Sequence, residues 1–162
     1  MQLLLISDAN VLIDLEEGGL TVELFRLPYV LTVPDILFID ELELHHGHLL
    51  ELGLQLRELT SDSMTYAQQL VRRYGGPSAN DCLALALARQ EACPLVTGDK
   101  RLRKAADQEQ VEKRGTIWLL EQMLDHRLIT VQQAEAARDL MRQAGSRLPW
   151  DKLDQLIERF NP

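Results

Sequence analysis

Residues 94–102 read Pro94-Leu95-Val96-Thr97-Gly98-Asp99-Lys100-Arg101-Leu102, and this stretch does most to predict the fold. Its apolar run is long enough only for a buried strand, and Gly98 permits a tight exit into the helical pattern that follows. Asp99 is therefore expected at the carboxyl end of the strand. In open α/β sheets, ligands bind at that end of the strands.

The first residues of the chain repeat this pattern. Leu3–Ile6 is a second buried-strand run, and Asp8 follows it at the start of a helical stretch. Tyr29–Val33 and Leu54–Leu59 are further strand patterns, with helical patterns between the strands. Strands separated by helices imply parallel pairing through crossover connections. We therefore predict an α/β fold, a three-layer α/β/α sandwich with a central, mainly parallel sheet and extra C-terminal helices.

Capping residues and helix stops place the helices of this sandwich. Ser61 or Asp62 is expected to cap a helix that ends at Tyr74, and Ser78 or Asn80 the helix after it. The other helical patterns cover residues 10–14, 20–27, 34–46, 100–108, 115–127, 130–144 and 149–160.

Length and charge limit the possible functions. A chain of 162 residues with 46% hydrophobic content is expected to form one domain with a sizeable core. The net charge of −8 comes from the first half, where residues 1–80 carry 4 Lys+Arg against 12 Asp+Glu. This charge has the wrong sign for bulk attraction to nucleic acid. Nucleic-acid binding would have to depend on a local basic patch and a bound metal.

The cysteines and the apolar runs favour a cytoplasmic protein. Cys82 and Cys93 lie in apolar surroundings, which is typical of thiols in a reducing compartment. The apolar run at Leu3–Ile6 is too short for a signal sequence or a membrane span. We therefore expect no association with a membrane.

Four acidic residues could converge on one site. Asp8 and Asp99 follow strands, Asp81 lies in the first turn of a helix, and Glu41 lies in the helix that begins near Pro34. Carboxylates brought together repel one another, and a divalent cation relieves that repulsion. Mg²⁺ or Mn²⁺ suits such oxygen ligands, and a site of this kind can activate water and hold a phosphate. Taken alone, Asp8 or Asp81 would read as a helix cap, Asp99 as a turn residue and Glu41 as part of a solvated helix face, and only their joint placement favours a shared site.

Four stretches resemble the acidic motifs of PIN domains. Ser7–Ile13 resembles their opening motif, Ser78–Ala86 their third acidic segment, and Val96–Leu102 their fourth. Val33-Pro34 followed by Asp40-Glu41-Leu42 matches the second acidic position. The resemblance covers roughly residues 1–125 in order and spacing. It implies a PIN-like catalytic domain over 1–125, with 126–162 as a helical extension packed on the same domain.

The resemblance implies a metal-dependent endoribonuclease, a hydrolase often found as a VapC-like toxin paired with an antitoxin. A metal-bound water would attack the phosphodiester bond and leave a 5′-phosphate and a 3′-hydroxyl. Asn10 and Thr97 match the polar positions that support the metal-binding carboxylates by hydrogen bonds. The residues that would bind one or two Mg²⁺ or Mn²⁺ ions are Asp8, Glu41, Asp81 and Asp99.

The second acidic position has three candidates in this chain, Asp40, Glu41 and Glu43. Glu41 is the choice, because it follows Pro34 at the interval usual in the family and precedes Leu42. Loss of this one ligand would leave the identity of the site unchanged.

Neighbouring residues suggest the partners. The basic run Lys100, Arg101, Arg103 and Lys104 reads either as a phosphate-binding rim beside the metal site or as a solvated helix face. The Leu and Ala stripe through Leu83, Ala84, Leu87 and Ala88 reads as core or as part of a dimer surface, since PIN domains commonly form homodimers. The acidic first half would suit a basic antitoxin segment.

Two other functions compete with the nuclease. A PIN fold can serve as a non-catalytic binding or scaffold module, although the four filled acidic positions argue against this. A receiver-like phosphoacceptor also carries an aspartate after its first strand, but it needs an adjacent acidic pair, and Asp8 is flanked by Ser7 and Ala9. The cluster His45-His46-Gly47-His48 reads as a polar helix end rather than a zinc site, because no second ligand cluster accompanies it.

Overall fold

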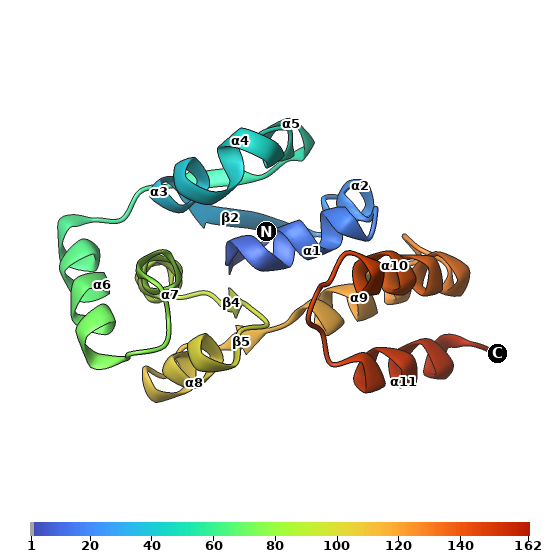
Figure 1. Cartoon of the computed structure of the whole chain (residues 1–162). Coiled ribbons are helices and arrows are strands. Elements are labelled where there is room, and N and C mark those ends of the chain that lie inside the picture. Colours follow the sequence, from blue (N-terminus) through green and yellow to red (C-terminus); the bar gives the residue numbers. More distant parts are fainter. Residues whose placement is uncertain (1) are drawn as a thin grey trace.

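The computed structural model describes residues 2–162 as a five-stranded sheet flanked by helices (Figure 1). The strand order is β3-β2-β1-β4-β5, and every neighbouring pair is parallel. This arrangement confirms the predicted three-layer α/β/α fold. The strands are β1 (Leu3–Ser7), β2 (Tyr29–Pro34), β3 (Gln55–Arg57), β4 (Leu95–Val96) and β5 (Lys113–Arg114).

Strand β1 lies at the centre of the sheet. Its register pairs Leu5 with Leu31 of β2 and Ser7 with Val96 of β4. Just beyond β1, the backbone N–H of Asp8 donates to the carbonyl oxygen of Val96 at 3.0 Å. The chain extends the sheet to one side of β1 through β3 and then crosses to the other side with β4. The carboxyl ends of β1 and β4 therefore form a topological switch point, where open α/β sheets bind ligands.

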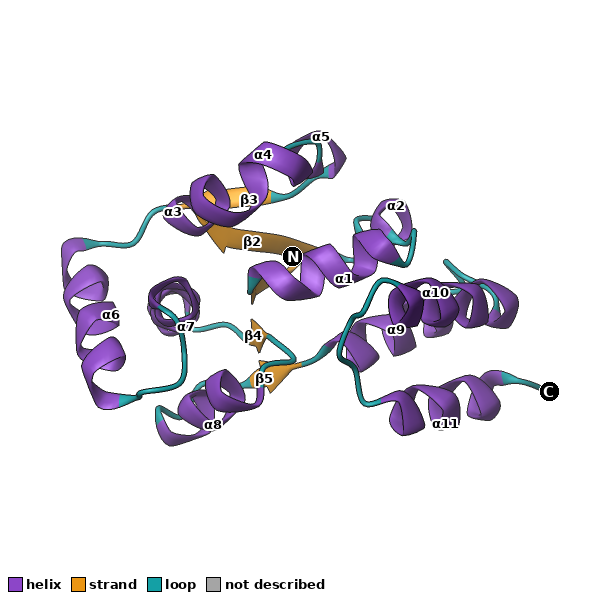
Figure 2. Cartoon of the chain, viewed as in Figure 1, coloured by secondary structure: helices purple, strands orange, loops and turns teal. Residues whose placement is uncertain are grey.

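The helices cover the sheet and continue beyond it (Figure 2). They are α1 (Ala9–Glu17), α2 (Thr21–Leu24), α3 (Asp35–Leu37), the π-helical turn η1 (Phe38–Leu42), α4 (Glu43–His46), α5 (Leu49–Leu52), α6 (Ser61–Arg73), α7 (Ala79–Glu91), α8 (Lys100–Gln108), α9 (Thr116–Asp125), α10 (Val131–Gln143) and α11 (Trp150–Phe160).

Several elements differ from the sequence prediction. The single helix expected over 34–46 is the succession α3–η1–α4, and neither α5 nor β5 was predicted. The cap of α6 is Thr60, whose hydroxyl accepts from the Ser63 backbone N–H at 3.1 Å, so the assignment of Ser61 or Asp62 was wrong. Ser78 does cap α7, and its hydroxyl accepts from the Asp81 backbone N–H at 3.0 Å.

Helix α7 forms the buried centre of the fold. All its residues from Cys82 to Ala88 are buried, because the helix packs against β1, β2 and β4 and against α6 and α8. In Figure 1 it lies between α6 and the sheet. The Leu and Ala stripe along this helix therefore belongs to the core of the chain.

The last helices pack on the sheet domain. Helix α10 lies against α1, and α11 packs on α9 and α10. At the end of α1, a Cβ atom on Gly18 would lie 3.2 Å from Met141 Cγ and 3.3 Å from Ala137 Cβ, so the two helices approach closely there. Cys82 and Cys93 are free thiols. No helix within residues 2–162 is long and apolar enough to cross a membrane.

The burial of α7 predicts a matched pair of stability effects. Leu87 is fully buried, so Leu87→Ala is expected to lower the free energy of unfolding by about 2–5 kcal/mol through lost packing and a cavity. Leu140 in α10 is 47% exposed, and Leu140→Ala is expected to change it by less than about 0.5 kcal/mol. Urea denaturation of both variants measures the difference. Equal losses would contradict the central position of α7.

Candidate active site at the carboxyl edge of the sheet

Asp8 is the most buried carboxylate at the carboxyl edge, with 2% of its surface exposed. It caps α1, because its Oδ1 accepts from the Val11 backbone N–H at 3.0 Å. Its Oδ2 accepts a hydrogen bond from the hydroxyl of Thr97. Both carboxylate oxygens are thus held, one by a donor in the first turn of α1 and the other by a donor just beyond β4, and the side chain has a fixed orientation.

The surroundings of Asp8 disfavour its charge. Burial raises the pKa of its carboxyl from 3.8 to about 7 and is the largest cause of the shift. The hydrogen bonds from Thr97 and Val11 act in the opposite direction, whereas the negative charges of Asp81 and Asp14 raise the pKa further. Asp8 is therefore a buried carboxylate that is unfavourable in its charged form. It lies at the switch point between β1 and β4, where the strand order reverses.

Thr97 joins the two strand ends on which the predicted site depends. Its side chain is fully buried, and its hydroxyl donates to Asp8 while accepting from the Asp99 backbone N–H at 3.1 Å. Arg103 stabilises the same turn, because its Nη1 donates to the carbonyl oxygens of Thr97 at 2.8 Å and Arg114 at 3.1 Å. The ends of β4 and β5 are therefore held to α8.

Asp81 and Asp99 both serve as helix caps in this structure. Asp99 Oδ1 accepts from the backbone N–H groups of Arg101 and Leu102, each at 2.9 Å. Asp81 Oδ2 accepts from the Ser78 backbone N–H at 2.9 Å and closes a capping box at the start of α7. Each cap occupies one carboxylate oxygen, and the other oxygen carries no hydrogen bond in the described part of the chain.

Glu41 approaches the site from the π-helical turn η1. Partial burial raises the pKa of its carboxyl, a hydrogen bond with Asn80 opposes the shift, and the charges of Asp81 and Asp40 add to it. Asn80 also donates to Asp40 Oδ2 at 3.3 Å. Asn80 thus links the second acidic segment to the start of α7. Glu43 lies in the following helix α4 and is exposed.

These four carboxylates share one edge but do not yet form a coordination sphere. Asp81 is close enough to raise the pKa values of both Asp8 and Glu41, and Asp99 connects to Asp8 through Thr97. Within residues 2–162, no three His, Cys, Asp or Glu side chains are grouped closely enough to hold a metal ion. The donor set is nonetheless of carboxylate oxygens, which fits Mg²⁺ or Mn²⁺. Binding would require the acidic side chains to move closer together.

The remaining predicted site residues lie in three different environments. Lys100, Arg101 and Lys104 are exposed on α8, beside Asp99, as a phosphate-binding rim would require. Arg103 is half-buried and its guanidinium contacts the two backbone carbonyls, so it supports the turn instead. Asn10 is exposed in the first turn of α1, and no hydrogen bond connects it to the acidic side chains in the part of the chain described.

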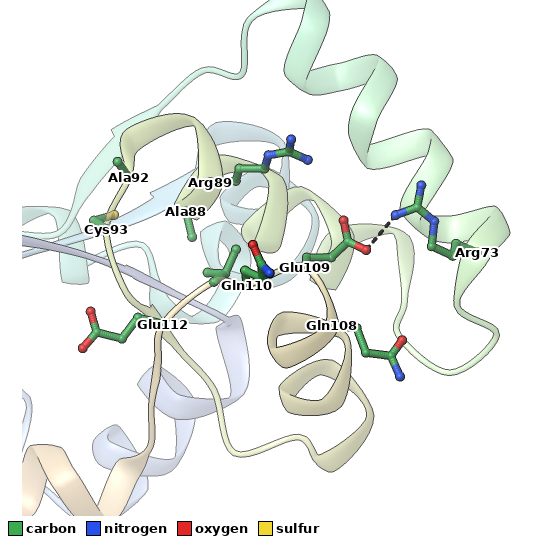
Figure 3. Close-up of a pocket in the computed structure, with 10 residues that line it drawn as sticks. Arg73, Ala88, Arg89, Ala92, Cys93, Gln108, Glu109, Gln110 and Glu112 are labelled. Atoms are coloured by element: carbon green, nitrogen blue, oxygen red, sulfur yellow. Dashed lines mark hydrogen bonds and ion pairs between the residues drawn. The ribbon is translucent and has the colours of Figure 1, made fainter.

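One surface pocket lies away from this edge (Figure 3). Its volume is about 680 Å³, and it lies beside the amino ends of β4 and β5. Figure 3 shows Arg73 paired with Glu109. The distance from Arg73 Nη1 to Glu109 Oε2 is 2.7 Å, and the carboxylate of Glu109 also accepts from the hydroxyls of Tyr66 and Tyr74, each at 2.6 Å. None of the predicted site residues lines it.

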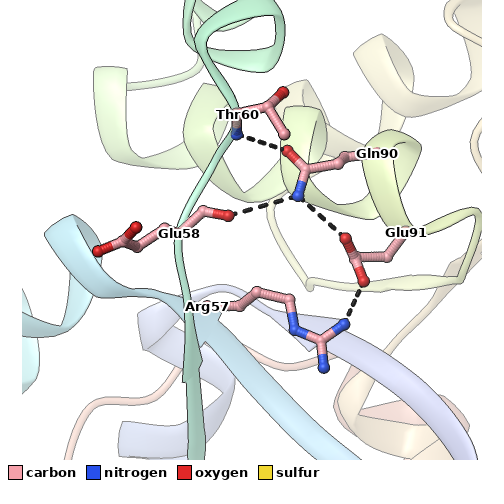
Figure 4. Close-up of polar contacts among 5 residues, drawn as sticks. All are labelled: Arg57, Glu58, Thr60, Gln90 and Glu91. Atoms are coloured by element: carbon pink, nitrogen blue, oxygen red, sulfur yellow. Dashed lines mark hydrogen bonds and ion pairs between the residues drawn. The ribbon is translucent and has the colours of Figure 1, made fainter.

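A second polar cluster holds β3 and the start of α6 to the end of α7 (Figure 4). Gln90 accepts from the Thr60 backbone N–H at 2.9 Å and donates to the Glu58 carbonyl oxygen at 3.3 Å, while Glu91 pairs with Arg57. These contacts hold the elements of the fold together.

The histidine cluster also has a structural partner, because His46 and His48 both contact the carboxylate of Glu16 at the end of α1.

The fold and its acidic edge define a class of protein, the α/β/α domains with carboxylates gathered at the switch point of a parallel sheet. A family model described as a PIN domain matches residues 4–162, which is nearly the whole chain and includes the helices after residue 125. The chain therefore belongs to the PIN domain family, whose members are generally nucleases. No curated protein matches the chain.

Sequence reasoning did not find all the residues that build this edge. Arg103 was assigned to phosphate binding with its neighbours, since nothing in the sequence distinguishes an inward arginine from an outward one. Asn80 was considered only as a possible cap. Its position directly before Asp81 was the one available signal.

The raised pKa of Asp8 predicts a pH-dependent loss of stability in the metal-free protein. The native state keeps a proton that the unfolded chain releases, so the free energy of unfolding is expected to fall between pH 4 and pH 7. A shift from 3.8 to about 7 corresponds to about 4 kcal/mol. Asp8→Asn removes this titration and is expected to be more stable than the wild type at pH 8 in EDTA.

Denaturant titrations at pH 4 to 8 measure this effect. Glu51→Gln, at an exposed carboxyl in α5, is the control and is expected to keep the wild-type pH dependence. A parallel decline in Asp8→Asn would show that other groups cause it.

Proposed function

We propose that this chain is a metal-dependent endoribonuclease that hydrolyses RNA phosphodiester bonds with Mg²⁺ or Mn²⁺. The observation that carries the proposal is Asp8, a buried carboxylate at the switch point of a PIN-family sheet, whose pKa is raised by burial and by the negative charge of Asp81. A buried, uncompensated carboxylate among other carboxylates is stabilised by a cation.

The chain supplies each part of such a site. Asp8, Glu41, Asp81 and Asp99 would hold the ion, which when bound activates water and polarises the phosphate. Thr97 keeps the Asp8 carboxylate in one orientation, and its contact with the Asp99 backbone ties the two ligands together. The exposed cations of α8 lie next to Asp99 and would neutralise phosphates of the RNA backbone.

Cleavage of labelled RNA tests the proposal. The wild type is expected to cleave RNA with Mg²⁺ or Mn²⁺ and to stop when EDTA removes the metal. Asp99→Asn is expected to lower the cleavage rate by about a hundredfold or more. A bound metal contributes several kcal/mol of transition-state stabilisation, and loss of one ligand weakens that contribution. Asp62→Asn, at an exposed site in the first turn of α6, is the control and is expected to keep the activity.

The capping roles of Asp81 and Asp99 favour a second candidate, a non-catalytic PIN-fold binding module, because each carboxylate already has a structural partner. RNA binding without cleavage under any metal condition would identify that function. Labelled DNA in the same assay distinguishes a ribonuclease from a general nuclease.

We further propose that the protein is the cytoplasmic toxin of a toxin–antitoxin pair and acts as a homodimer. The family resemblance suggests this role, and the acidic first half of the chain would suit a basic antitoxin segment. Growth arrest on expression of the wild type but not of Asp99→Asn would support it. Normal growth on expression of an active enzyme would reject the toxin role and leave the nuclease proposal intact.

A further inference from the structure

The loop between α6 and α7 passes unusually close to the start of α8. A Cβ atom on Gly76 would lie 2.3 Å from Arg101 Cδ, 2.9 Å from Arg101 Cβ and 3.0 Å from Arg101 Cγ. Gly76 is not among the glycines with a positive φ, so a glycine is required here by space rather than by backbone conformation. The stem of Arg101 therefore lies directly on the backbone of the loop.

This contact joins the two helix starts that carry predicted metal ligands. Two residues beyond Gly76, Ser78 begins the capping box that contains Asp81. On the other side, the Arg101 backbone N–H donates to the carboxylate of Asp99 at 2.9 Å. Any displacement of the loop from α8 would change the separation between these two carboxylates.

The guanidinium of Arg101 also differs from the other arginines near it. Arg103 is bound to two carbonyl oxygens, and Arg73 is paired with Glu109. Arg101 is exposed, and no carboxylate pairs with its guanidinium anywhere in residues 2–162. Its stem is held by packing while its charge remains available. An arginine held in this way loses less side-chain entropy when it binds a phosphate with two parallel hydrogen bonds.

We propose that Arg101, whose stem packs against the backbone of Gly76, binds a backbone phosphate of the RNA beside the acidic site. Gly76 is then a positioning residue for Arg101. This inference rests on the proposed function and adds the residue that holds the substrate. Lys100 and Lys104 lie four residues apart on α8, and both are exposed, so they supply further positive charge beside the site.

The first test measures binding of a labelled single-stranded RNA in EDTA, where hydrolysis is stopped, at several salt concentrations. Loss of one phosphate contact is expected to reduce the slope of log K against log salt by about 0.7 in Arg101→Ala. Affinity is expected to fall about tenfold, as for one charge-assisted hydrogen bond, and Arg101→Lys to recover part of it. Lys152→Ala removes an exposed charge from α11 and is expected to leave the slope unchanged.

The second test uses the glycine. Gly76→Ala keeps every charge but displaces the Arg101 stem, so KM is expected to rise severalfold, as in Arg101→Ala, while kcat falls less. Thermal unfolding adds a double-variant comparison. Gly76→Ala is expected to lower Tm, and Arg101→Ala in the same chain to restore most of it by removing the Cδ and Cγ contacts. The 2.9 Å contact with Arg101 Cβ would leave a smaller residual loss.

The outcomes separate this inference from the proposed function. Wild-type RNA cleavage combined with an unchanged salt slope in Arg101→Ala would overturn the role of Arg101 and leave the nuclease standing. A double variant no more stable than Gly76→Ala would overturn the proposed packing of the Arg101 stem against Gly76. A wild type that neither binds RNA in EDTA nor cleaves it with Mg²⁺ or Mn²⁺ would overturn both the phosphate contact and the nuclease, whereas the Tm comparison would still report on the packing. If the wild type cleaves RNA with metal but does not bind it in EDTA, an unchanged KM in Arg101→Ala would overturn the role of Arg101 alone.

Discussion

The hydrogen bond from the Thr97 hydroxyl to the Asp8 carboxylate joins the end of the central strand β1 to the end of its neighbour β4. Thr97 is buried because β4 inserts between β1 and β5, and Asp8 is buried because it caps α1 directly after β1. This side-chain bond orients the acidic edge, since Thr97 also accepts from the backbone of Asp99. It adds a side-chain link to the backbone pairing of β1 and β4, in which the Asp8 N–H donates to the Val96 carbonyl oxygen and already joins the first and last acidic motifs.

The first turn of helix α8 makes three different structural contacts. Asp99 caps it, Arg103 anchors its inner side to the ends of β4 and β5, and Arg101 rests on the loop before α7. These contacts fix the helix relative to both neighbouring strands and the adjacent loop. A binding rim on a rigid helix beside the site is better positioned than one on a free loop.

The acidic edge opposes stability, and the core of the chain offsets that cost. Burial of Asp8 near Asp81 disfavours ionisation, and Glu41 experiences the same influence at lower burial. Against this, α7 buries a continuous run of apolar side chains at the centre of the sandwich. Like charges gathered at one edge of a well-packed sheet are a common feature of functional sites. In this chain the helix that contributes most to the core also carries Asp81 at its start.

Much of this protein follows from its sequence alone, because apolar runs and capping residues act over a few neighbouring positions. They were sufficient to predict β1, β2 and β4 and the whole of α8, and they limited the cap of α7 to Ser78 or Asn80, of which Ser78 is the cap in the structure. The order of the acidic motifs predicted the family. The tertiary structure decided the rest. Lys113–Arg114 has no strand pattern and becomes β5 only because the edge of β4 is available for pairing.

The same limit applies to the site. Three features of the site depend on segments that are distant in the sequence and meet only in the folded chain. They are the inward direction of Arg103, the π-helical turn that carries Glu41, and the lack of space for a side chain at Gly76. Local pattern cannot report such contacts, because they are set by packing between elements.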